Sequence, residues 1–396
     1  MTPVKRTRAP LAAAALLVAL LACVLAQASG ARARVAALDA GSVAISWPAV
    51  HGTAYVGIWR GGRLEDLVYG RRGGTYLDRG LWPQSRFRYV VAAIGRGGRT
   101  LRRWRVSAAT PARSGSFPRL FADSSPFNVP IPPNPALDPA SARMVAGAIQ
   151  PYVGGANFTN SAEWGIPVFY ANRRSRRYRV SCDRYCSAPV GFPRIPSDAR
   201  ASTGSDGHLA VLDPADGSEL DMWLARRTPT GWVGGVRSLA ELGGSGVHCR
   251  ACGRPDAAGF ALAAGIVRPE EIAQGHIDHA LVITTPHTRG GLKACPAVGT
   301  DGDSGDSAAL PLGARVQLDP GLNVDALGLP GWQKTIARAL QTYGAYVVDT
   351  GGSLSIRAES NLGRGYDAWA LAGVPDFPSI SGLPWQLLRV LQIARC

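Results

Sequence analysis

The 396-residue chain is poor in several residue types: it contains only three Lys, three Met and six His. After an apolar run near its N-terminus, no segment has the roughly 20 apolar residues that a membrane-spanning helix requires. No internal repeat or glycine-rich phosphate loop occurs, and neither a Gly-x-Ser-x-Gly elbow nor a His-Glu-x-x-His helix is present. We therefore expect no membrane span, and the standard motifs of nucleotide-binding proteins, α/β-hydrolases and zinc proteases are excluded.

The first 28 residues have the pattern of a secretory signal peptide. Basic residues precede an apolar run at 11–25, and an Ala-Gln-Ala cleavage site follows at 26–28. An alternative is a lipoprotein signal with Cys23 acylated, which would anchor the protein to the outer face of a membrane. The expected location is extracellular, and the mature protein is expected to be soluble.

Six Cys remain after removal of this signal. An even number of thiols in an oxidising compartment predicts three disulfides. The sequence does not determine the pairing, but the close spacings suggest the pairs Cys182 with Cys186, Cys249 with Cys252, and Cys295 with the terminal Cys396. A four-thiolate zinc site built from the two short-spaced pairs, with His248 beside one of them, is the alternative.

The net charge of +15 is distributed unevenly. Residues 31–113 contain fifteen Arg and four acidic residues, a net of +11, whereas the chain after them is nearly neutral. Outside a cell, such a basic segment favours an anionic cell-wall polymer, an acidic polysaccharide or lipid head groups as a partner, and not nucleic acid. The chain has forty Arg beside three Lys, so GC-rich codon usage is a sufficient alternative explanation.

Residues 35–110 have the pattern of strands and turns throughout, with period-two alternation at 42–47 and 54–59. The order GSVAISW, YVGIWRGGRLEDLVY and TYLDRGLWPQSRFRYVVAAIGRGGR resembles a fibronectin type III domain. That resemblance implies an accessory β-sandwich, and Trp47 is expected to lie in its core. In that family Leu, Pro and Tyr form a corner, at the places that Leu81, Pro83 and Phe87 occupy here. Phe87 lacks the hydroxyl, so either Tyr89 contributes differently or the corner is simply packed.

A linker at 111–117 separates this module from a principal domain at 118–396, which is long enough for one sizeable core. We expect a β-rich α+β domain, a sandwich or barrel with flanking helices. The predicted strands are 165–171, 177–182, 208–212, 220–225, 278–284, 314–318, 345–349 and 353–358. The predicted helices are 141–153, 256–266, 269–274, 332–343 and 384–393.

The segment GSDGHLAVLDPADGSELDMW supplies the first candidate site. His208 begins a strand, and a turn at 213–217 returns the chain through Glu219 and Asp221. Antiparallel pairing would bring an acidic side chain near His208. Such a group could perform general acid/base chemistry or hold a divalent metal, whereas the alternative is the polar face of a hairpin.

Further candidates follow along the chain. His279 lies where a helix meets a strand, and Asp349 ends a strand before two glycines. Either residue could be catalytic. The structural alternatives are a hydrogen-bonded core histidine for His279 and a cap of the following turn for Asp349. The loop GTDGDSGDSAA offers a weak Ca²⁺ site, with the candidate ligands Asp301, Asp303 and Asp306, but it lacks the full alternation of a calcium loop.

The strings SPFNVPIPPNPALDP, IDHALVITTP, LGARVQLDP and WQKTIARALQTYGAYVVDTGG resemble a group of secreted actinobacterial proteins, a resemblance that supplies no catalytic assignment. The leading hypothesis is a secreted carbohydrate-active enzyme, a glycoside hydrolase or polysaccharide lyase that acts on extracellular or cell-wall polysaccharide through His208, Glu219, Asp221 and His279. The alternative is a noncatalytic protein that binds glycan or the cell envelope.

Overall fold

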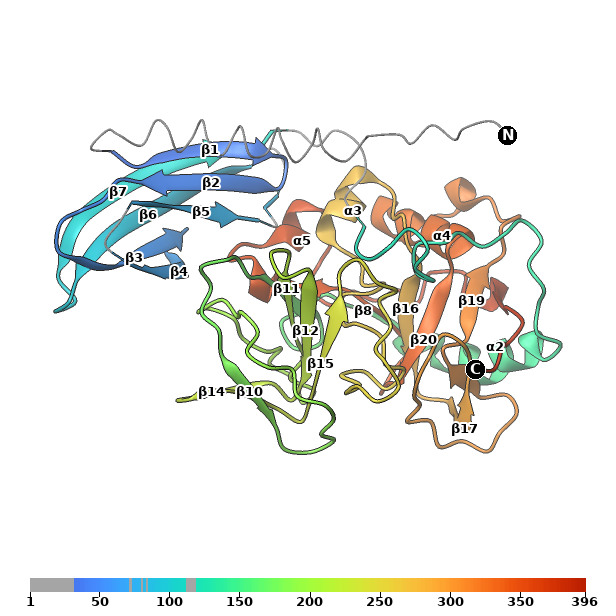
Figure 1. The fold of residues 1–396 in the computed structure, drawn as a ribbon. Helices are drawn as coiled ribbons and strands as arrows, with labels where there is room; N and C mark the ends of the chain where they lie inside the picture. The colour runs from blue at the N-terminus through green and yellow to red at the C-terminus, as the bar shows by residue number, and fades with distance from the viewer. Residues whose placement is uncertain (1–31, 71–72, 80, 83–84, 112–118) are drawn as a thin grey trace, which may run out of the picture. The chain divides into compact units, whose positions relative to one another are not determined.

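The structure, a computed structural model, consists mostly of β-strands with few helices (Figure 1). It describes residues 32–396 apart from 71–72, 80, 83–84 and 112–118. The predicted signal peptide with Cys23, Pro83 and almost all of the predicted linker lie outside the described residues. The chain divides into two compact units, one before and one after residues 112–118. Among the helices of the described chain, none has both the length and the apolar character that crossing a membrane needs.

The first unit is a β-sandwich of a three-stranded and a four-stranded sheet, with the strand orders β1-β2-β5 and β4-β3-β6-β7. Every neighbouring pair is antiparallel. The strands are β1 (Arg34–Asp39), β2 (Ser42–Trp47), β3 (Thr53–Arg60), β4 (Arg63–Tyr69), β5 (Gly74–Asp78), β6 (Arg86–Gly95) and β7 (Thr100–Ala109).

The core of this unit follows from strand alternation. On β6, the exposed Arg88 lies between the buried Phe87 and Tyr89, so the two aromatic rings point between the sheets. Trp47 is also buried there, as predicted. The hydroxyl of Tyr89 donates to Asp78 Oδ2 at 2.8 Å. Phe87 is buried, and Tyr89 supplies a buried hydroxyl contact to Asp78.

The second unit contains two larger sheets, of five strands in the order β15-β12-β11-β9-β22 and of six strands in the order β23-β19-β20-β16-β21-β8. Two smaller sheets, β10-β14-β13 and β17-β18, complete it. The strands are β8 (Asn157–Thr159), β9 (Ile166–Tyr170), β10 (Arg179–Cys182), β11 (Leu209–Asp213), β12 (Ser218–Trp223), β13 (Arg226–Thr228), β14 (Gly231–Gly234), β15 (Val236–Glu241), β16 (Leu281–Thr285), β17 (Thr288–Lys293), β18 (Leu310–Leu312), β19 (Arg315–Leu318), β20 (Ala345–Thr350), β21 (Ser355–Arg357), β22 (Glu359–Ser360) and β23 (Leu388–Val390).

Within the described ranges, the α-helices are short and few. They are α2 (Ser141–Ala148), α3 (Pro269–Gln274), α4 (Gly331–Thr342) and α5 (Ala368–Leu371), with 3-10 turns at Gln150–Gly155, Val324–Ala326, Asn361–Gly363 and Trp385–Leu387. Helix α4 packs its apolar stripe, including the fully buried Ile336 and Leu340, toward the core beside β19. The helices thus cover sheets and do not form a bundle.

Two segments pass from one large sheet to the other. Residues 355–360 form β21 in the six-stranded sheet and then β22 in the five-stranded sheet, while 157–170 form β8 and then β9 in the same way. The pairs β21 with β8 and β22 with β9 are both parallel. One continuous apolar core therefore runs beneath both sheets, which agrees with the predicted β-rich domain with flanking helices.

Two predicted helices are wrong. Residues 256–266 form turns, because Asp256 Oδ1 accepts from the backbone N–H groups of Gly259 and Phe260 and because Gly259 and Gly265 adopt φ of 80° and 72°. The predicted helix at 384–393 contains one 3-10 turn followed by β23, since Leu388 and Val390 pair with β19. In that segment, strand pairing with β19 outweighs the local helix propensity.

The three predicted disulfides are formed. They join Cys182 to Cys186, Cys249 to Cys252, and Cys295 to Cys396. The last bond closes a loop with a sequence separation of 101 residues. Because the sulfurs of the two short-spaced pairs are consumed in disulfides, the alternative zinc site is not formed.

Candidate active site

A polar cleft of about 460 Å³ opens where the ends of β16 and β20 meet the start of β21. Asp349 at the end of β20 is in register with Thr284 on the parallel strand β16, directly after a β-bulge between Ile283 and Thr284. Bulges of this kind redirect side chains and are frequent beside active sites. The cleft is lined by Asn157, Thr159, Trp164, Ser205, Asp206, Thr284, Asp349, Thr350, Gly351, Gly352, Ser353, Ser355, Arg357 and Phe377.

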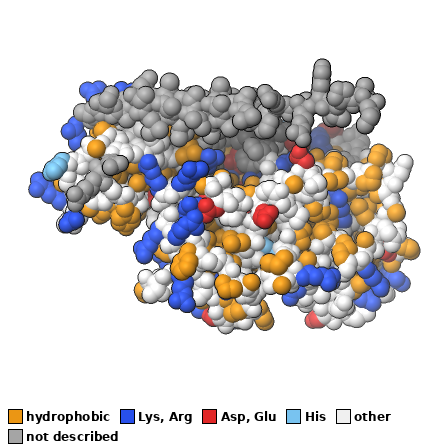
Figure 2. All heavy atoms as spheres, in the orientation of Figure 1, with side chains coloured by type: hydrophobic (Ala, Val, Ile, Leu, Met, Phe, Trp, Pro, Cys, Tyr) orange, Lys and Arg blue, Asp and Glu red, His pale blue; other side chains and the backbone are white. Residues whose placement is uncertain are grey.

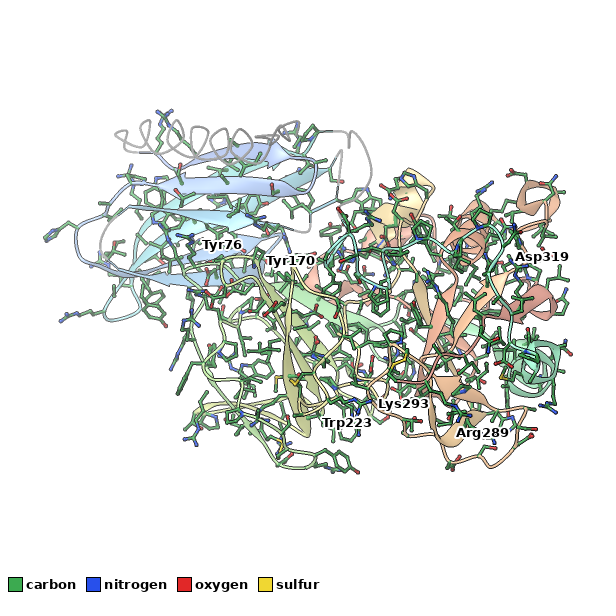
Figure 3. All side chains as sticks on the ribbon, turned by 45° about the vertical axis from the view of Figure 1, so that its right-hand side comes forward. Tyr76, Tyr170, Trp223, Arg289, Lys293 and Asp319 are labelled. Atoms are coloured by element: carbon green, nitrogen blue, oxygen red, sulfur yellow. A yellow bond between two sulfur atoms is a disulfide. The ribbon has the colours of Figure 1, made fainter. Side chains whose placement is uncertain are left out.

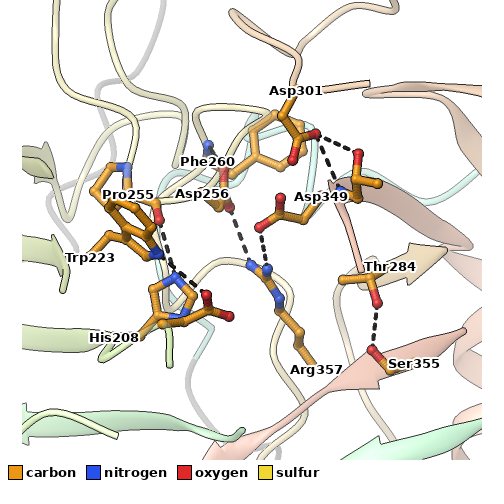
Figure 4. Close-up of polar contacts among 12 residues, drawn as sticks. His208, Trp223, Pro255, Asp256, Phe260, Thr284, Asp301, Asp349, Ser355 and Arg357 are labelled. Atoms are coloured by element: carbon orange, nitrogen blue, oxygen red, sulfur yellow. Dashed lines mark hydrogen bonds and ion pairs between the residues drawn. The ribbon is translucent and has the colours of Figure 1, made fainter. Parts of the chain in front are cut away.

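The carboxyl group of Asp349 is held from one side by Arg357, whose Nη2 donates to Oδ2 at 2.6 Å (Figure 4). Arg357 is itself buried and also faces Asp256, with 3.7 Å between Nη1 and Oδ2. Its guanidinium therefore lies between two carboxyl groups, which fixes its plane and the direction in which Asp349 points. Asp349 remains partly open, since 21% of its side chain is exposed.

A second carboxylate adjoins Asp349. Asp301 Oδ1 accepts from the hydroxyl and the backbone N–H of Thr350, at 2.7 and 3.3 Å, which places its carboxylate beside that of Asp349. Burial raises the pKa of Asp349 to about 8; Arg357 opposes this rise, whereas Asp301 and Asp256 add to it. This pKa favours the protonated form of Asp349 at neutral pH, in which it can act as a proton donor.

His208 and Asp206 form another part of the same region. Asp206 lines the cleft, and its Oδ1 accepts from Trp223 Nε1 at 3.4 Å (Figure 4). His208 lies behind it, buried, with Nε2 3.1 Å from the carbonyl oxygen of Pro255. Burial and the positive charge of Arg357 lower the pKa of His208 to about 4, so it is a neutral donor to that carbonyl. Trp223, labelled in Figure 3, projects from the end of β12.

Glu219 and Asp221, the predicted carboxylate pair, lie away from this cleft in the core. Both are completely buried. Glu219 accepts from the N–H of Ala263, and Asp221 accepts from the N–H of Leu262 and from His248 Nε2 at 3.0 Å. Burial raises both pKa values, that of Asp221 to about 7. In register, Asp221 lies opposite Ala210 and not opposite His208. The structure therefore gives these two acids hydrogen-bond partners in the interior and no opening for a substrate.

His279 is also remote from the cleft. Its Nε2 lies 2.9 Å from Glu271 Oε1 and its Nδ1 lies 3.0 Å from the carbonyl oxygen of Ala280. Burial lowers the pKa of His279, but the carboxylate of Glu271 outweighs burial and raises it overall. The adjoining hollow measures only about 10 Å³, room for about one water molecule. A polymer cannot enter there.

The three acids of the predicted calcium loop separate from one another. Asp301 binds Thr350, Asp306 Oδ1 accepts from the N–H of Ala308, and Asp303 is exposed. In the part of the chain that the structure describes, no three His, Cys, Asp or Glu side chains converge as a metal site requires. Only Asp301 adjoins the cleft, and it does so as the neighbour of Asp349.

Sequence reasoning included Asp349 but missed Arg357 and Asp256. A signal for Arg357 was present: in the strand around it, Leu354, Ile356 and Ala358 alternate with residues of the other face. Period two therefore places Arg357 on the same face as Ser353 and Ser355, both of which line the cleft. No sequence signal connects Asp256 to this site, because its position depends on a turn that was predicted as a helix.

Comparison with known proteins identifies no family. No protein-family model matches the sequence, and no curated protein matches it. Among solved structures, the chain is similar to an exopolygalacturonase of family 28 from Yersinia enterocolitica, at 15% identity and a TM-score of 0.19, over 21% of this chain and 20% of that one. It is also similar to the sixth fibronectin type III domain of human fibronectin type III domain containing protein 3, at 21% identity and a TM-score of 0.17, over 22% of this chain and 89% of that domain. The chain thus spans about a fifth of the length of the enzyme, and TM-scores this low decide neither fold nor function.

Proposed function

We propose that this protein is a secreted carbohydrate-active enzyme that cleaves extracellular or cell-wall polysaccharide in the Asp349 cleft. The observation that carries the proposal is the position of Asp349, whose carboxyl group is anchored by Arg357 and adjoins Asp301 at a polar cleft. Two features of the lining suit a sugar: hydroxyl and amide groups at Thr284, Ser355 and Asn157, and the partly exposed ring of Trp164.

The chemistry follows from the protonation state of the site. Protonated Asp349 donates its proton to the glycosidic oxygen as the bond between that oxygen and the anomeric carbon breaks. Water then adds to the anomeric carbon, and its proton passes to the carboxylate of Asp206 on the cleft wall. Arg357 acts as a positioning residue, because its guanidinium holds the carboxyl group of Asp349. The products are a new reducing end and a new hydroxyl end.

An extracellular location is part of the proposal. Three disulfides support it, because such bonds persist in oxidising compartments. The signal-like segment at the N-terminus supports it from the sequence. Within this proposal, the first unit serves as a fibronectin type III-like accessory module, and the second unit as the catalytic domain.

The test is a reducing-end assay across a panel of bacterial and plant polysaccharides. Wild-type protein is compared with Asp349→Asn, which keeps the shape of the side chain but cannot donate the acid proton. Asp303→Asn is the matched control, since Asp303 is an exposed acid of a nearby loop that does not line the cleft. We expect a loss of about 10²–10⁴-fold in turnover for Asp349→Asn, the usual contribution of a general acid, and none for the control.

Two results would reject the proposal. If Asp349→Asn cleaved the substrate as fast as wild type, the acid would lie elsewhere. If wild type bound a polysaccharide saturably but released no product from any member of the panel, the noncatalytic alternative would hold. A product with an unsaturated sugar ring would instead identify the lyase reaction, in which a base removes a proton next to a carboxyl group.

A further inference from the structure

We infer that the outer face of the β4-β3-β6-β7 sheet binds acidic polysaccharide through an arginine cluster formed by Arg86, Arg88, Arg103 and Arg105. All four side chains are exposed. On β6 the first two alternate with buried Phe87 and Tyr89, and on β7 the other two flank buried Trp104. Alternation therefore places the whole cluster on the face that points away from the core.

Strand register brings these side chains together. Arg103 pairs with Ala92, Arg105 with Val90, and Arg88 with Ser107. Arg103 and Arg105 are two residues apart on one strand, and Arg88 is diagonal to Arg105, so neighbouring side chains of the cluster originate about 7–8 Å apart. Like charges at this spacing repel one another, and a bound polyanion would relieve that repulsion.

The carboxylates that the structure describes in this unit lie in its interior. Glu65, Asp66 and Asp78 are all buried. Arg60, also buried, pairs with two of them, at 3.2 Å to Glu65 and 2.8 Å to Asp78. Among the side chains that the structure describes in this unit, every exposed acidic or basic group is therefore a cation or a histidine. GC-rich codon usage can account for the large number of arginines. It does not account for the burial of the acidic side chains, or for the position of all four cluster residues on one face of the sheet.

The same face also carries aromatic rings. Trp59 pairs with Val90, which pairs with Arg105, so the three side chains form one row across the sheet. Tyr55, four residues before Trp59 on β3, pairs with Tyr69 on β4, and their ring centroids are 5.9 Å apart. Sugar rings stack on such side chains, and guanidinium groups bind carboxylates through paired hydrogen bonds. This combination favours a polysaccharide of uronic acids over a lipid surface or a nucleic acid. Figure 2 shows Arg side chains, in blue, at the surface of this unit.

The test measures binding of full-length protein to alginate by affinity electrophoresis, with its propylene glycol ester as the uncharged form of the same polymer. The variant carries Arg88→Gln, Arg103→Gln and Arg105→Gln. The matched control carries Arg96→Gln, Arg99→Gln and Arg102→Gln, which removes the same charge from exposed positions outside the cluster. Thermal unfolding checks that both variants fold.

We expect the cluster variant to bind alginate about tenfold more weakly, from three contacts of about 0.5 kcal/mol each, while the control changes by less than about twofold. Wild type should bind the ester weakly. If both variants lost the same amount of affinity for alginate, net charge alone would explain the binding and the proposed site would be rejected. Unchanged affinity in both variants would also reject it. Equally tight binding to phosphatidylglycerol vesicles or duplex DNA would overturn the choice of partner. Binding is measured by electrophoretic mobility and cleavage by reducing-end release, so this inference and the proposed cleavage can fail independently.

Discussion

Arg357 holds Asp349 at the edge of the cleft, with 2.6 Å between Nη2 and Oδ2, and faces Asp256 on its other side. One buried cation thus organises two carboxyl groups. It also limits how far burial raises the pKa of Asp349. The orientation and the protonation state of the proposed acid therefore depend on the same residue.

Arg357→Met should move the alkaline limit of activity to higher pH, because the positive charge that opposes the rise in the pKa of Asp349 is lost. It should also destabilise the fold by about 3–5 kcal/mol, since Asp256 loses its partner in the interior. Arg357→Lys, which keeps the charge, is the control. The measurements are the pH dependence of kcat/KM and urea unfolding. An alkaline limit that stayed in place in Arg357→Met would show that Arg357 does not act on the proton donor.

Glu219→Gln should leave turnover within about twofold of wild type, because Glu219 is fully buried away from the cleft and its substitute has nearly the same shape. Glu219→Ala should lower the free energy of unfolding by about 1–3 kcal/mol, because the N–H of Ala263 then loses its acceptor. Reducing-end assays and urea unfolding measure the two effects. A large loss of turnover in a well-folded Glu219→Gln variant would restore Glu219 as a catalytic candidate.

The buried carboxyl pair should also make stability depend on pH. The pKa values of Glu219 and Asp221 are raised in the folded state, so the folded protein retains protons that the unfolded chain releases above about pH 4. Their contribution is fully present below that pH and decreases as the pH rises through the folded value, about 7 for Asp221. Thermal unfolding between pH 5 and 9 should show this decrease, and the double variant Glu219→Gln, Asp221→Asn should flatten it. An equal slope in both proteins would contradict this assignment.

The Cys295 to Cys396 disulfide should stabilise the protein more than the two short-range bonds. Its sequence separation is 101 residues, against four for Cys182 and Cys186. Chain entropy alone gives about 5 kcal/mol for the long loop and about 2 kcal/mol for the short one. Paired Cys→Ser variants and urea unfolding would compare them. A larger loss from the short bond would show that local geometry, and not loop length, controls stability here.

Sequence patterns predicted much of the fold because period-two alternation determines where strands lie and which residues they bury. Trp47 is buried as expected, and all eight strands predicted for the second unit are formed, with bounds within three residues of the prediction. The other eight strands that the structure describes in that unit were not predicted. The pattern failed at 256–266 and 384–393, where an apolar run is compatible with either a helix or a buried segment, and only tertiary contacts decide.

The site was harder to predict than the fold. Residues of one cleft come from β8, β16, β20 and β21, which are distant in the sequence. Hairpin pairing correctly joins Glu219 and Asp221 to the strand of His208, but it does not reveal that a loop at 256–263 covers the two acids. The pattern of acidic residues near a histidine thus predicted a site at Glu219 and Asp221, where the structure has a buried hydrogen-bond network. The other candidate, the strand end at Asp349, lies in the cleft.

The most direct test of the central claim is the pH dependence of kcat/KM for the polysaccharide that wild type cleaves, from pH 5 to pH 10. If protonated Asp349 is the acid, its pKa of about 8 predicts a rate that decreases about tenfold for each pH unit above that value. Asp303→Asn should follow the same curve, and Asp349→Asn should lack this decrease at its much lower rate. A wild-type rate that stays constant or rises up to pH 10 would contradict the assignment of Asp349 as the proton donor.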